Sequence, residues 1–495
     1  MLSARSLTVA MVAGLIVAGV VRSLGFLTYV GYTIGSPVQV LILEGSNVHF
    51  AWRAQQGLCV FPDADHYPYA VNLTGPVYFW VVGGLGRLLR ADIAGLYTIG
   101  RSVSFACILL SAALLTVFLG CRYGRWAAVA GAAFACGAAP MVSFGIMVRP
   151  DMLAQLLGLA GFLLSGRPTR GALVGASVLL SLSFLTKQTA GVYLIAAAVA
   201  LVWHDGQKGR AASLCLLTAA IVLAIVVALA LSGEPHIVPC LLGQGATPWT
   251  LATLRLIGMV AVERAPDMFW FTLAGSVVWF AGPLRDRRWL SLALVLLSSA
   301  VVTSAKVGAD VNYFLGLCFV EAVAVAVLCQ AALRGAVRRS LVAAAILPGL
   351  LFVLPGQWYT AHTARLAYRN HRFLQTTAGR QWLAEYQQLL RLAEDPGAAM
   401  FSAADAVAAH QGRHAVMLDS CLFRLRVDAG KTDPAELIRR LQSHRFHYVV
   451  LAQDIRRHLD KAMYFRLPRE VVAAVMQHYR LLGPPQAGFF VYVPR

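Results

Sequence analysis

Long uncharged stretches separated by short charged loops dominate the first 357 residues of the chain. The run "SLCLLTAAIVLAIVVALALSG" (213–233) has no charged residue over the roughly 20 residues that a bilayer-spanning helix needs. Such runs are apolar on every face, whereas the strands of a membrane barrel alternate with period two. The pattern therefore predicts a polytopic all-α membrane domain.

Eleven segments of the chain fit this pattern, and each is expected to cross the membrane as a helix. They lie at about 7–29, 101–120, 126–146, 152–166, 171–186, 188–203, 211–231, 268–283, 290–304, 313–332 and 341–357.

Beyond these segments the pattern changes, because charges and histidines become dense from Tyr359 onward and no run is long enough to span. Short apolar runs with strand composition alternate there with one helical pattern, in which Asp433 is the expected cap and Pro434 lies in the first turn. The sequence therefore predicts a transmembrane domain at 1–357 and a small soluble α/β domain at 358–495. The expected strands are 398–403, 414–419, 446–452 and 488–493, and the expected helix is 433–444.

The basic residues of the loops predict the orientation. Alternate loops carry two or three Lys or Arg residues each, whereas the loops between them carry the single residues Arg149, Lys187 and Lys306. Excess Lys and Arg mark the cytoplasmic side of a membrane protein. The N-terminus is therefore expected in the cytoplasm. The first long loop and the tail are both expected on the extracytoplasmic side. The basic loops are 121–125, 167–170, 205–210, 284–288 and 333–339.

Composition agrees with a membrane protein. Of the 495 residues, 58% are hydrophobic and 13% charged, against about 25% charged in soluble domains. A net charge of +19 can indicate nucleic acid, but here loop charge and anionic membrane lipids explain it and no nucleic-acid partner is expected. The first twenty residues resemble a signal peptide, yet the apolar run continues past Arg22, which favours a retained anchor.

The first extracytoplasmic loop, 31–100, is much longer than the roughly 15 residues of ordinary loops. Glu44 follows the end of the first apolar segment, in "LEGSNVHFAWRAQQG". The stretch "GPVYFWVVGGLGRLLR" (75–90) is expected to form a helix in the interface, with Tyr78 and Trp80 at headgroup level. Other polar side chains of this loop are Arg53, Asp63, Asp65, His66, Tyr67, Tyr69 and Asn72.

Metal binding is not expected. Asp63 and Asp65 could form a pair of ligands, but no partner follows them at ligand spacing. The nine cysteines show no CxxC pair or Cys/His spacing typical of a metal site, so most are interpreted as small core residues. We expect neither a metal nor another cofactor, although a divalent ion stays an alternative.

Further polar groups fall on the same predicted face: Arg149 and Asp151, then Lys187, then Lys306, Asp310, Asn312 and Tyr313. A carboxylate can act as a general base, and a nearby cation can hold an anion or stabilise a leaving phosphate. A single charge at the end of a span can also be an interfacial anchor that is nearly free to snorkel. Glu321 lies inside an expected span, and such acids usually face a cavity or a partner.

The order of these motifs resembles that of a known family. "LEGSNVHFAWRAQQG" is followed by "YPYAVNLTGPVYFWVV", "GRSVS" (100–104), "RPDMLAQ", a lysine after "LSFLT", and "GADVNYFL" (308–315). Over about 7–357 this resembles the bacterial GT-C membrane glycosyltransferases, near the protein-mannosyltransferase and aminoarabinose-transferase relatives. The lipopolysaccharide-core galacturonosyltransferase-like group looks most similar.

This resemblance implies an integral enzyme of the bacterial inner membrane that uses a polyprenyl-phosphate-linked sugar as donor. It implies an inverting transfer on the outer face to a lipid, glycan or protein acceptor. The family's two acidic residues fall on Glu44 and Asp151, which are the expected catalytic residues, and its donor-phosphate cation on Lys187. Many relatives carry an Asp, or an Asp-Glu pair, where this chain has Leu43-Glu44, so only one carboxylate is available at that point. Further expected substrate-binding residues are Arg149, His66, Tyr67, Tyr78, Asn312 and Tyr313.

Two other functions stay open at the level of sequence. A transporter or flippase of lipid-linked sugars would place its binding groups near the midplane, often in repeated halves. The polar groups here lie at span ends and no internal repeat is found, so Glu321 is the feature that favours a transporter. A non-catalytic scaffold that presents the tail domain leaves the long first loop unexplained.

Overall fold

A computed structural model describes residues 4–40, 43–63, 65–242, 248–281, 287–307, 309–334, 339–455 and 467–495. The chain folds into two compact units. The first, here called the helical unit, contains Met1–Gly35, Ser102–Ile225 and Trp249–Tyr368. The second, here called the α/β unit, contains Ser36–Arg101, Val226–Pro248 and Arg369–Arg495.

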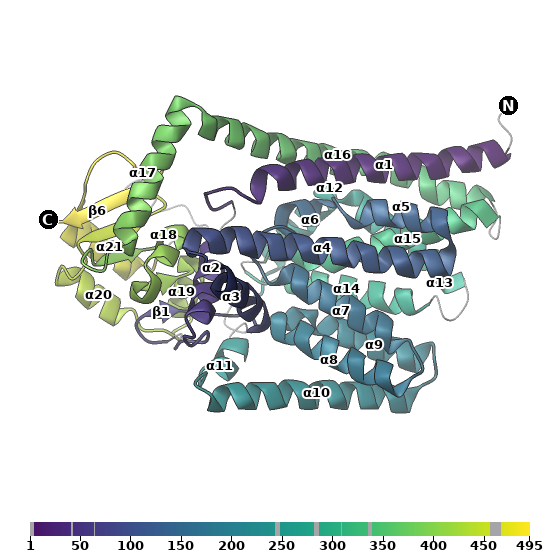
Figure 1. Ribbon diagram of the computed structural model, residues 1–495, viewed down its shortest axis with the longest axis horizontal. Helices are drawn as coiled ribbons and strands as arrows, with labels where there is room; N and C mark the ends of the chain where they lie inside the picture. The colour runs from purple at the N-terminus through teal and green to yellow at the C-terminus, as the bar shows by residue number, and fades with distance from the viewer. Residues whose placement is uncertain are drawn as a thin grey trace. The chain divides into compact units, whose positions relative to one another are not determined.

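The helical unit is built from helices, as Figure 1 shows, and many of them are apolar. Some of these helices extend past the limits of the unit. In the described part of the chain they are α1 (Ala4–Thr33), α4 (Ile93–Tyr123), α5 (Arg125–Ala135), α6 (Ala139–Phe144), α7 (Asp151–Ser165), α8 (Arg170–Thr186), α9 (Val192–Trp203), α10 (Lys208–Leu231), α12 (Leu251–Arg264), α13 (Pro266–Ala281), α14 (Arg288–Ser304), α15 (Leu315–Arg334) and α16 (Arg339–Gln375).

Helices long and apolar enough to cross a membrane are found at five places in the described residues: Thr8–Thr33, Ile93–Tyr123, Lys208–Leu231, Val311–Arg334 and Val342–Gln375. Shorter apolar helices occupy several of the other expected spans, among them α7, α8 and α14. The helical membrane architecture expected from the sequence is therefore present, whereas the number of eleven crossings is not established by these helices.

Two local features differ from the expected spans. The segment 126–146 is broken between α5 and α6, where Gly137 has φ 82° and a Cβ would meet the backbone of Arg22. Helix α12 was missed, because Arg255 and Glu263 interrupt its apolar pattern. Charged residues on its exposed face thus made α12 unrecognisable as an apolar segment. The close contact at Gly137 separates α5 from α6.

Helix α15 forms the centre of the helical unit. Nearly all of its residues are buried, including every side chain from Leu315 to Cys329. Its sequence is apolar on all faces, which is the pattern of a helix surrounded by other helices. It packs against α5, α13 and α14, and this position encloses Glu321 completely.

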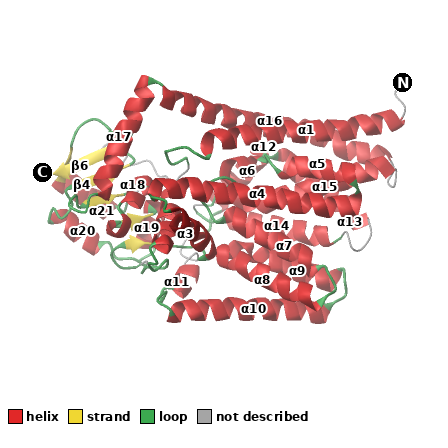
Figure 2. Cartoon of the chain, viewed as in Figure 1, coloured by secondary structure: helices red, strands yellow, loops and turns green. Residues whose placement is uncertain are grey.

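The α/β unit contains a four-stranded sheet with the order β2-β4-β6-β5, drawn in yellow in Figure 2. Strands β2 (Met400–Ser402) and β4 (Tyr448–Leu451) are parallel, whereas β6 (Phe490–Pro494) is antiparallel to both β4 and β5 (Tyr479–Leu481). The strands expected near 400, 450 and 490 are confirmed, and the expected helix is α20 (Ala435–Gln442). Strand β5 was not expected. The remaining helices are α2 (Glu44–Gln55), α3 (Val77–Leu89), α11 (Ile237–Leu242), α17 (Thr377–Glu394), α18 (Asp405–His410), α19 (Ser420–Asp428) and α21 (Arg469–His478).

The first loop and the tail share one core within this unit. Strand β1 (Tyr69–Ala70) pairs in parallel with β3 (Met417–Leu418). The buried ring of Tyr69 lies 4.6 Å from that of Phe423, and its hydroxyl donates to the carbonyl of Asp433 at 2.8 Å. The structure therefore groups residues differently from the domain boundary expected at 357. Local sequence pattern does not reveal a pairing between segments so far apart along the chain.

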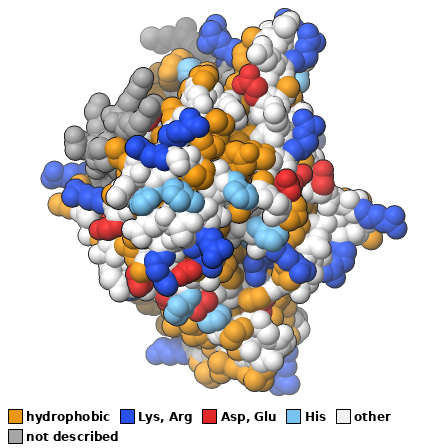
Figure 3. All heavy atoms as spheres, turned by 90° about the vertical axis from the view of Figure 1, so that its left-hand side faces the viewer, with side chains coloured by type: hydrophobic (Ala, Val, Ile, Leu, Met, Phe, Trp, Pro, Cys, Tyr) orange, Lys and Arg blue, Asp and Glu red, His pale blue; other side chains and the backbone are white. Residues whose placement is uncertain are grey.

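The surface of the α/β unit is polar and basic in places. His444, Arg445 and His447, which follow α20, are exposed. Figure 3 shows Lys, Arg and His side chains spread over the face in view, with acidic and hydrophobic groups between them. A mixed surface of this kind is typical of a protein part that faces water.

Candidate functional site

Five of the expected site residues meet in the helical unit, and we call them the Asp151 cluster: Arg149, Asp151, Lys187, Asn312 and Tyr313. Asp151 is the first residue of α7, preceded by the turn that holds Arg149. Lys187 ends α8, where the chain leaves helical geometry. Asn312 and Tyr313 belong to the short helix η4 (Val311–Phe314). Helix ends that are distant in sequence thus place their polar side chains together.

Asp151 is the centre of this cluster. Its Oδ1 lies 2.5 Å from Nζ of Lys187 and accepts from Nδ2 of Asn312 at 3.0 Å. Its Oδ2 accepts from Nε of Arg149 at 3.1 Å. Nζ of Lys187 also lies 5.4 Å from the ring centroid of Tyr313, a cation–π distance. Both carboxylate oxygens are therefore occupied by donors.

The cluster carries net positive charge in a buried place. Asp151 is 2% exposed and Lys187 9%, and two cations face one carboxylate. Buried charge is costly unless it is matched by a counter-charge, so the unmatched cation favours an anionic ligand such as a phosphate. The alternative of an interfacial anchor that is nearly free to snorkel does not describe Lys187, because its ammonium is held in an ion pair with Asp151.

Lys306 is a further cation near this cluster that the sequence analysis did not assign to a site. It lies outside the expected spans and is partly buried. Burial and the positive charge of Lys187 lower the pKa of Lys306 to about 8. Among the described residues no carboxylate lies within ion-pair distance of it. Its sequence signal was only that of a single basic residue on the predicted outer face.

Glu44, the other expected catalytic residue, lies in the α/β unit at the first position of α2. Its side chain is fully buried. Oε1 accepts from Nε of Arg101 at 3.1 Å, and Oε2 accepts from Nη2 of Arg101 at 2.9 Å and from the backbone of Val40 at 2.8 Å. Arg101 also donates to the carbonyls of Ser36 and Val38. The guanidinium therefore ties Glu44 to the backbone of the preceding loop.

Arg101 was not predicted as a functional residue. It is the arginine of the motif "GRSVS", and it is fully buried. A buried arginine needs a carboxylate or several carbonyls, and Arg101 has both. The motif was the signal that could have identified the partner of Glu44.

The other expected residues of the first loop have separate partners. The Tyr78 hydroxyl is buried and donates to the carbonyl of Gly100 at 3.2 Å, so the expectation that Tyr78 lies at headgroup level is wrong, because α3 turns this face inward. Trp80 on the same helix is 40% exposed. The side chain of His66 is 80% exposed with Nδ1 2.8 Å from Asp63. The Tyr67 ring lies under the guanidinium of Arg440 at 4.1 Å.

Asp63, Asp65 and His66 also line a recess of the α/β unit together with His236 and Arg426. Asp65 pairs with Arg426 through its Oδ1, which also accepts from the hydroxyl of Thr432. Among the described residues no group of three or more His, Cys, Asp or Glu side chains is placed to hold a metal ion. The donor set in the described residues therefore does not fit a metal centre.

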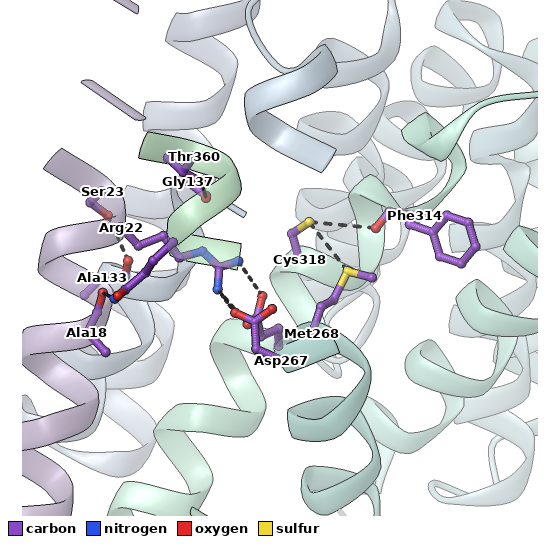
Figure 4. Close-up of polar contacts among 12 residues, drawn as sticks. Ala18, Arg22, Ser23, Ala133, Gly137, Asp267, Met268, Phe314, Cys318 and Thr360 are labelled. Atoms are coloured by element: carbon purple, nitrogen blue, oxygen red, sulfur yellow. Dashed lines mark hydrogen bonds and ion pairs between the residues drawn. The ribbon is translucent and has the colours of Figure 1, made fainter. Parts of the chain in front are cut away.

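Glu321 has a partner that the sequence did not name. Its carboxylate accepts two hydrogen bonds from Arg22 of α1, at 2.9 and 3.0 Å. Arg22 also pairs with Asp267 of α13, and Figure 4 shows its guanidinium directed at that residue. All three side chains are at most 1% exposed. This triad joins three helices and supplies the partner that the sequence could not name for Glu321.

Comparison with known proteins gives no match by sequence and several by structure. Neither a protein-family model nor a curated protein matches the chain. The crystal structure of ArnT from Cupriavidus metallidurans bound to undecaprenyl phosphate is similar with a TM-score of 0.58 and 14% identity, covering 95% of this chain and 97% of ArnT.

Two structures from Archaeoglobus fulgidus are similar as well. The oligosaccharyltransferase in complex with Zn and sulfate has a TM-score of 0.52 at 13% identity, covering 96% of this chain and 73% of that one. AglB in complex with an inhibitory peptide and a dolichol-phosphate has a TM-score of 0.51 at 13% identity, covering 96% and 74%. At this identity the likeness concerns the fold. Over nearly its whole length, the chain has the fold of the GT-C membrane glycosyltransferases ArnT and AglB, which confirms the resemblance found in its motifs.

Proposed function

We propose that this chain is an integral-membrane glycosyltransferase that takes a sugar from a polyprenyl-phosphate donor and transfers it with inversion to a lipid, glycan or protein acceptor. The observation that carries the proposal is the buried, net-positive Asp151 cluster in a chain with a GT-C fold. ArnT bound to undecaprenyl phosphate and AglB with a dolichol-phosphate support a lipid phosphate as one reactant.

In this proposal Arg149 and Lys187 hold the phosphate of the donor. The leaving group is a polyprenyl phosphate, which departs as a stable anion and therefore needs cations more than a proton. Burial strengthens these interactions, since charges attract more strongly where water is excluded. Asp151 keeps both cations in place, and we assign it this orienting role.

An inverting transfer also needs one base to accept the proton of the attacking hydroxyl group. We assign this role to Glu44, whose pair with Arg101 fixes its orientation. His66 and Tyr67, at least partly exposed, are proposed to contact the acceptor. The recess beside them has no metal-binding set in the described residues, and the assigned roles need none.

The proposed location is the inner membrane of a bacterium, with the N-terminus in the cytoplasm and the α/β unit outside. The alternation of basic loops supports it. Reporter fusions test it: a reporter after Arg495 should be extracytoplasmic and one after Arg210 cytoplasmic. A cytoplasmic C-terminus would contradict this orientation.

The function itself is tested by transfer in vitro and in the cell. The purified full chain, in nanodiscs with a panel of undecaprenyl-phosphate sugars, should release undecaprenyl phosphate when envelope extracts provide the acceptor. Mass spectrometry of the cell envelope with and without the gene should show the loss of one glycosylated species. If no donor is consumed and the two envelopes are identical, the proposed transfer is wrong.

A further inference from the structure

Asp405 of the tail lies against the first turn of α2, the helix that begins with Glu44. Its Oδ2 accepts from the backbone nitrogen of Leu43 at 3.2 Å. Its Oδ1 accepts from the backbone nitrogen of Asp419 at 3.3 Å. The side chain is 9% exposed, and Asp405 is itself the first residue of α18. One carboxyl group thus joins a residue of the first loop to two segments of the tail.

Both residues that donate these backbone bonds have the left-handed backbone conformation, which residues other than glycine rarely adopt. Leu43 has φ 75° and Asp419 has φ 61°. Such a conformation is strained in a residue other than glycine and persists only where its surroundings hold it. Leu43 and Asp419 are also the residues that precede α2 and α19. The Asp405 carboxyl group therefore accepts hydrogen bonds from the backbone at two helix starts that have this strained conformation.

The backbones of α2 and α18 also touch at this point. A Cβ atom at Gly45 would overlap the carbonyl group of Asp405, so no larger residue fits there without moving α2. Glu44 lies between the two fixed points, Leu43 before it and Gly45 after it. The Glu44 side chain points to Arg101, with which it forms an ion pair. Its direction depends on the position in which the tail holds this first turn of α2.

We propose that Asp405 is a positioning residue for Glu44. Asp405 holds the first turn of α2 through its hydrogen bond with the backbone of Leu43. Its consequence for transfer rests on the function proposed above. The first loop offers Leu43-Glu44, and the tail brings a carboxyl group to the backbone of Leu43. The tail is thereby part of the site that contains Glu44 rather than an independent appendage.

Hydrogen exchange of the full-length chain tests the positioning directly. Asp405→Ala removes the acceptor of both backbone groups, so the amides of residues 43–47 should exchange at least about tenfold faster. Asp405→Asn keeps an acceptor oxygen for Leu43 and should restore most of the protection. Asp395→Ala is the matched control, since Asp395 is an exposed aspartate of the tail that accepts only a local bond from Gly397. Unchanged exchange in Asp405→Ala would overturn the proposal.

Transfer kinetics test whether the effect passes through Glu44. Asp405→Ala should lower kcat about tenfold or more and change the KM for the donor less than about twofold, and Asp405→Asn should recover most of kcat. In a Glu44→Gln background Asp405→Ala should lower kcat no further, because coupled residues are not additive. Additive losses would overturn the proposal. If the wild-type chain transfers no sugar, the proposed function fails, and hydrogen exchange still decides the positioning.

Discussion

Replacement of Lys187 by methionine separates the structural part of the Asp151 cluster from its proposed function. Methionine keeps the apolar stem and removes the ammonium group. Loss of one partner from a buried ion pair typically costs about 3–5 kcal/mol. Asp151 keeps Arg149 and Asn312 as donors, so we expect the lower end of that range, about 3 kcal/mol. A charge-assisted bond to a phosphate is worth about 1.5–3 kcal/mol, which predicts a 10- to 100-fold weaker affinity for undecaprenyl phosphate.

The double variant Lys187→Met/Asp151→Asn then distinguishes the two effects. Because the carboxylate is neutralised together with the Lys187 cation, the cluster regains the net charge of the wild type, but Arg149 loses its ion pair, so the lost stability should return only in part. Binding should not return, since the cation that meets the phosphate is still missing. Thermal unfolding in detergent and titration with undecaprenyl phosphate measure the two quantities on the same sample. Lys431→Met, at an exposed lysine of the tail, is the control.

Two results would refute this reasoning. If Lys187→Met binds undecaprenyl phosphate as tightly as the wild type, the cation does not meet the phosphate. If the double variant regains binding together with stability, the loss in the single variant came from the disturbed fold. In both cases Lys187 is only a structural partner of Asp151.

Three further predictions concern carboxylates elsewhere in the chain. Glu44→Gln should lower turnover about 10²–10⁴-fold while donor binding is kept, and wild-type transfer at equal protein level would exclude Glu44 as the base. Burial and the neighbouring Asp419 raise the pKa of Asp405 to about 7, so the folded chain keeps a proton that the unfolded chain loses above about pH 4. The melting temperature should therefore fall as pH rises from about 4 to 7. In Asp405→Asn the melting temperature should fall less over this range. An equal slope in this variant would contradict the assignment. Glu321→Gln, which keeps an acceptor for Arg22, should unfold at a clearly higher temperature than Glu321→Ala, and equal melting temperatures would show that the triad does not stabilise the fold.

The sequence was sufficient where structure depends on short stretches of chain. Apolar runs of membrane length, such as the one that forms α10, are stable in the lipid bilayer and not in water. Their length and composition therefore predict a helix directly. The strands near 400 and 450 and the helix α20 were also predicted, because alternation and the residues that start a helix are local signals. The residues of the Asp151 cluster were predicted because span ends on one face lie near one another.

Only the tertiary structure decided which buried groups became partners. Burial requires that Glu44 and Glu321 be matched, but many arginines of the chain could match them, and packing selected Arg101 and Arg22. Nor does any local pattern join β1 to β3 or Asp405 to Leu43, since such contacts form only when distant segments share one core. The sequence by itself therefore determined most of the helices and strands and the polar residues that need partners. The fold determined the pairing, because pairing depends on distance in space.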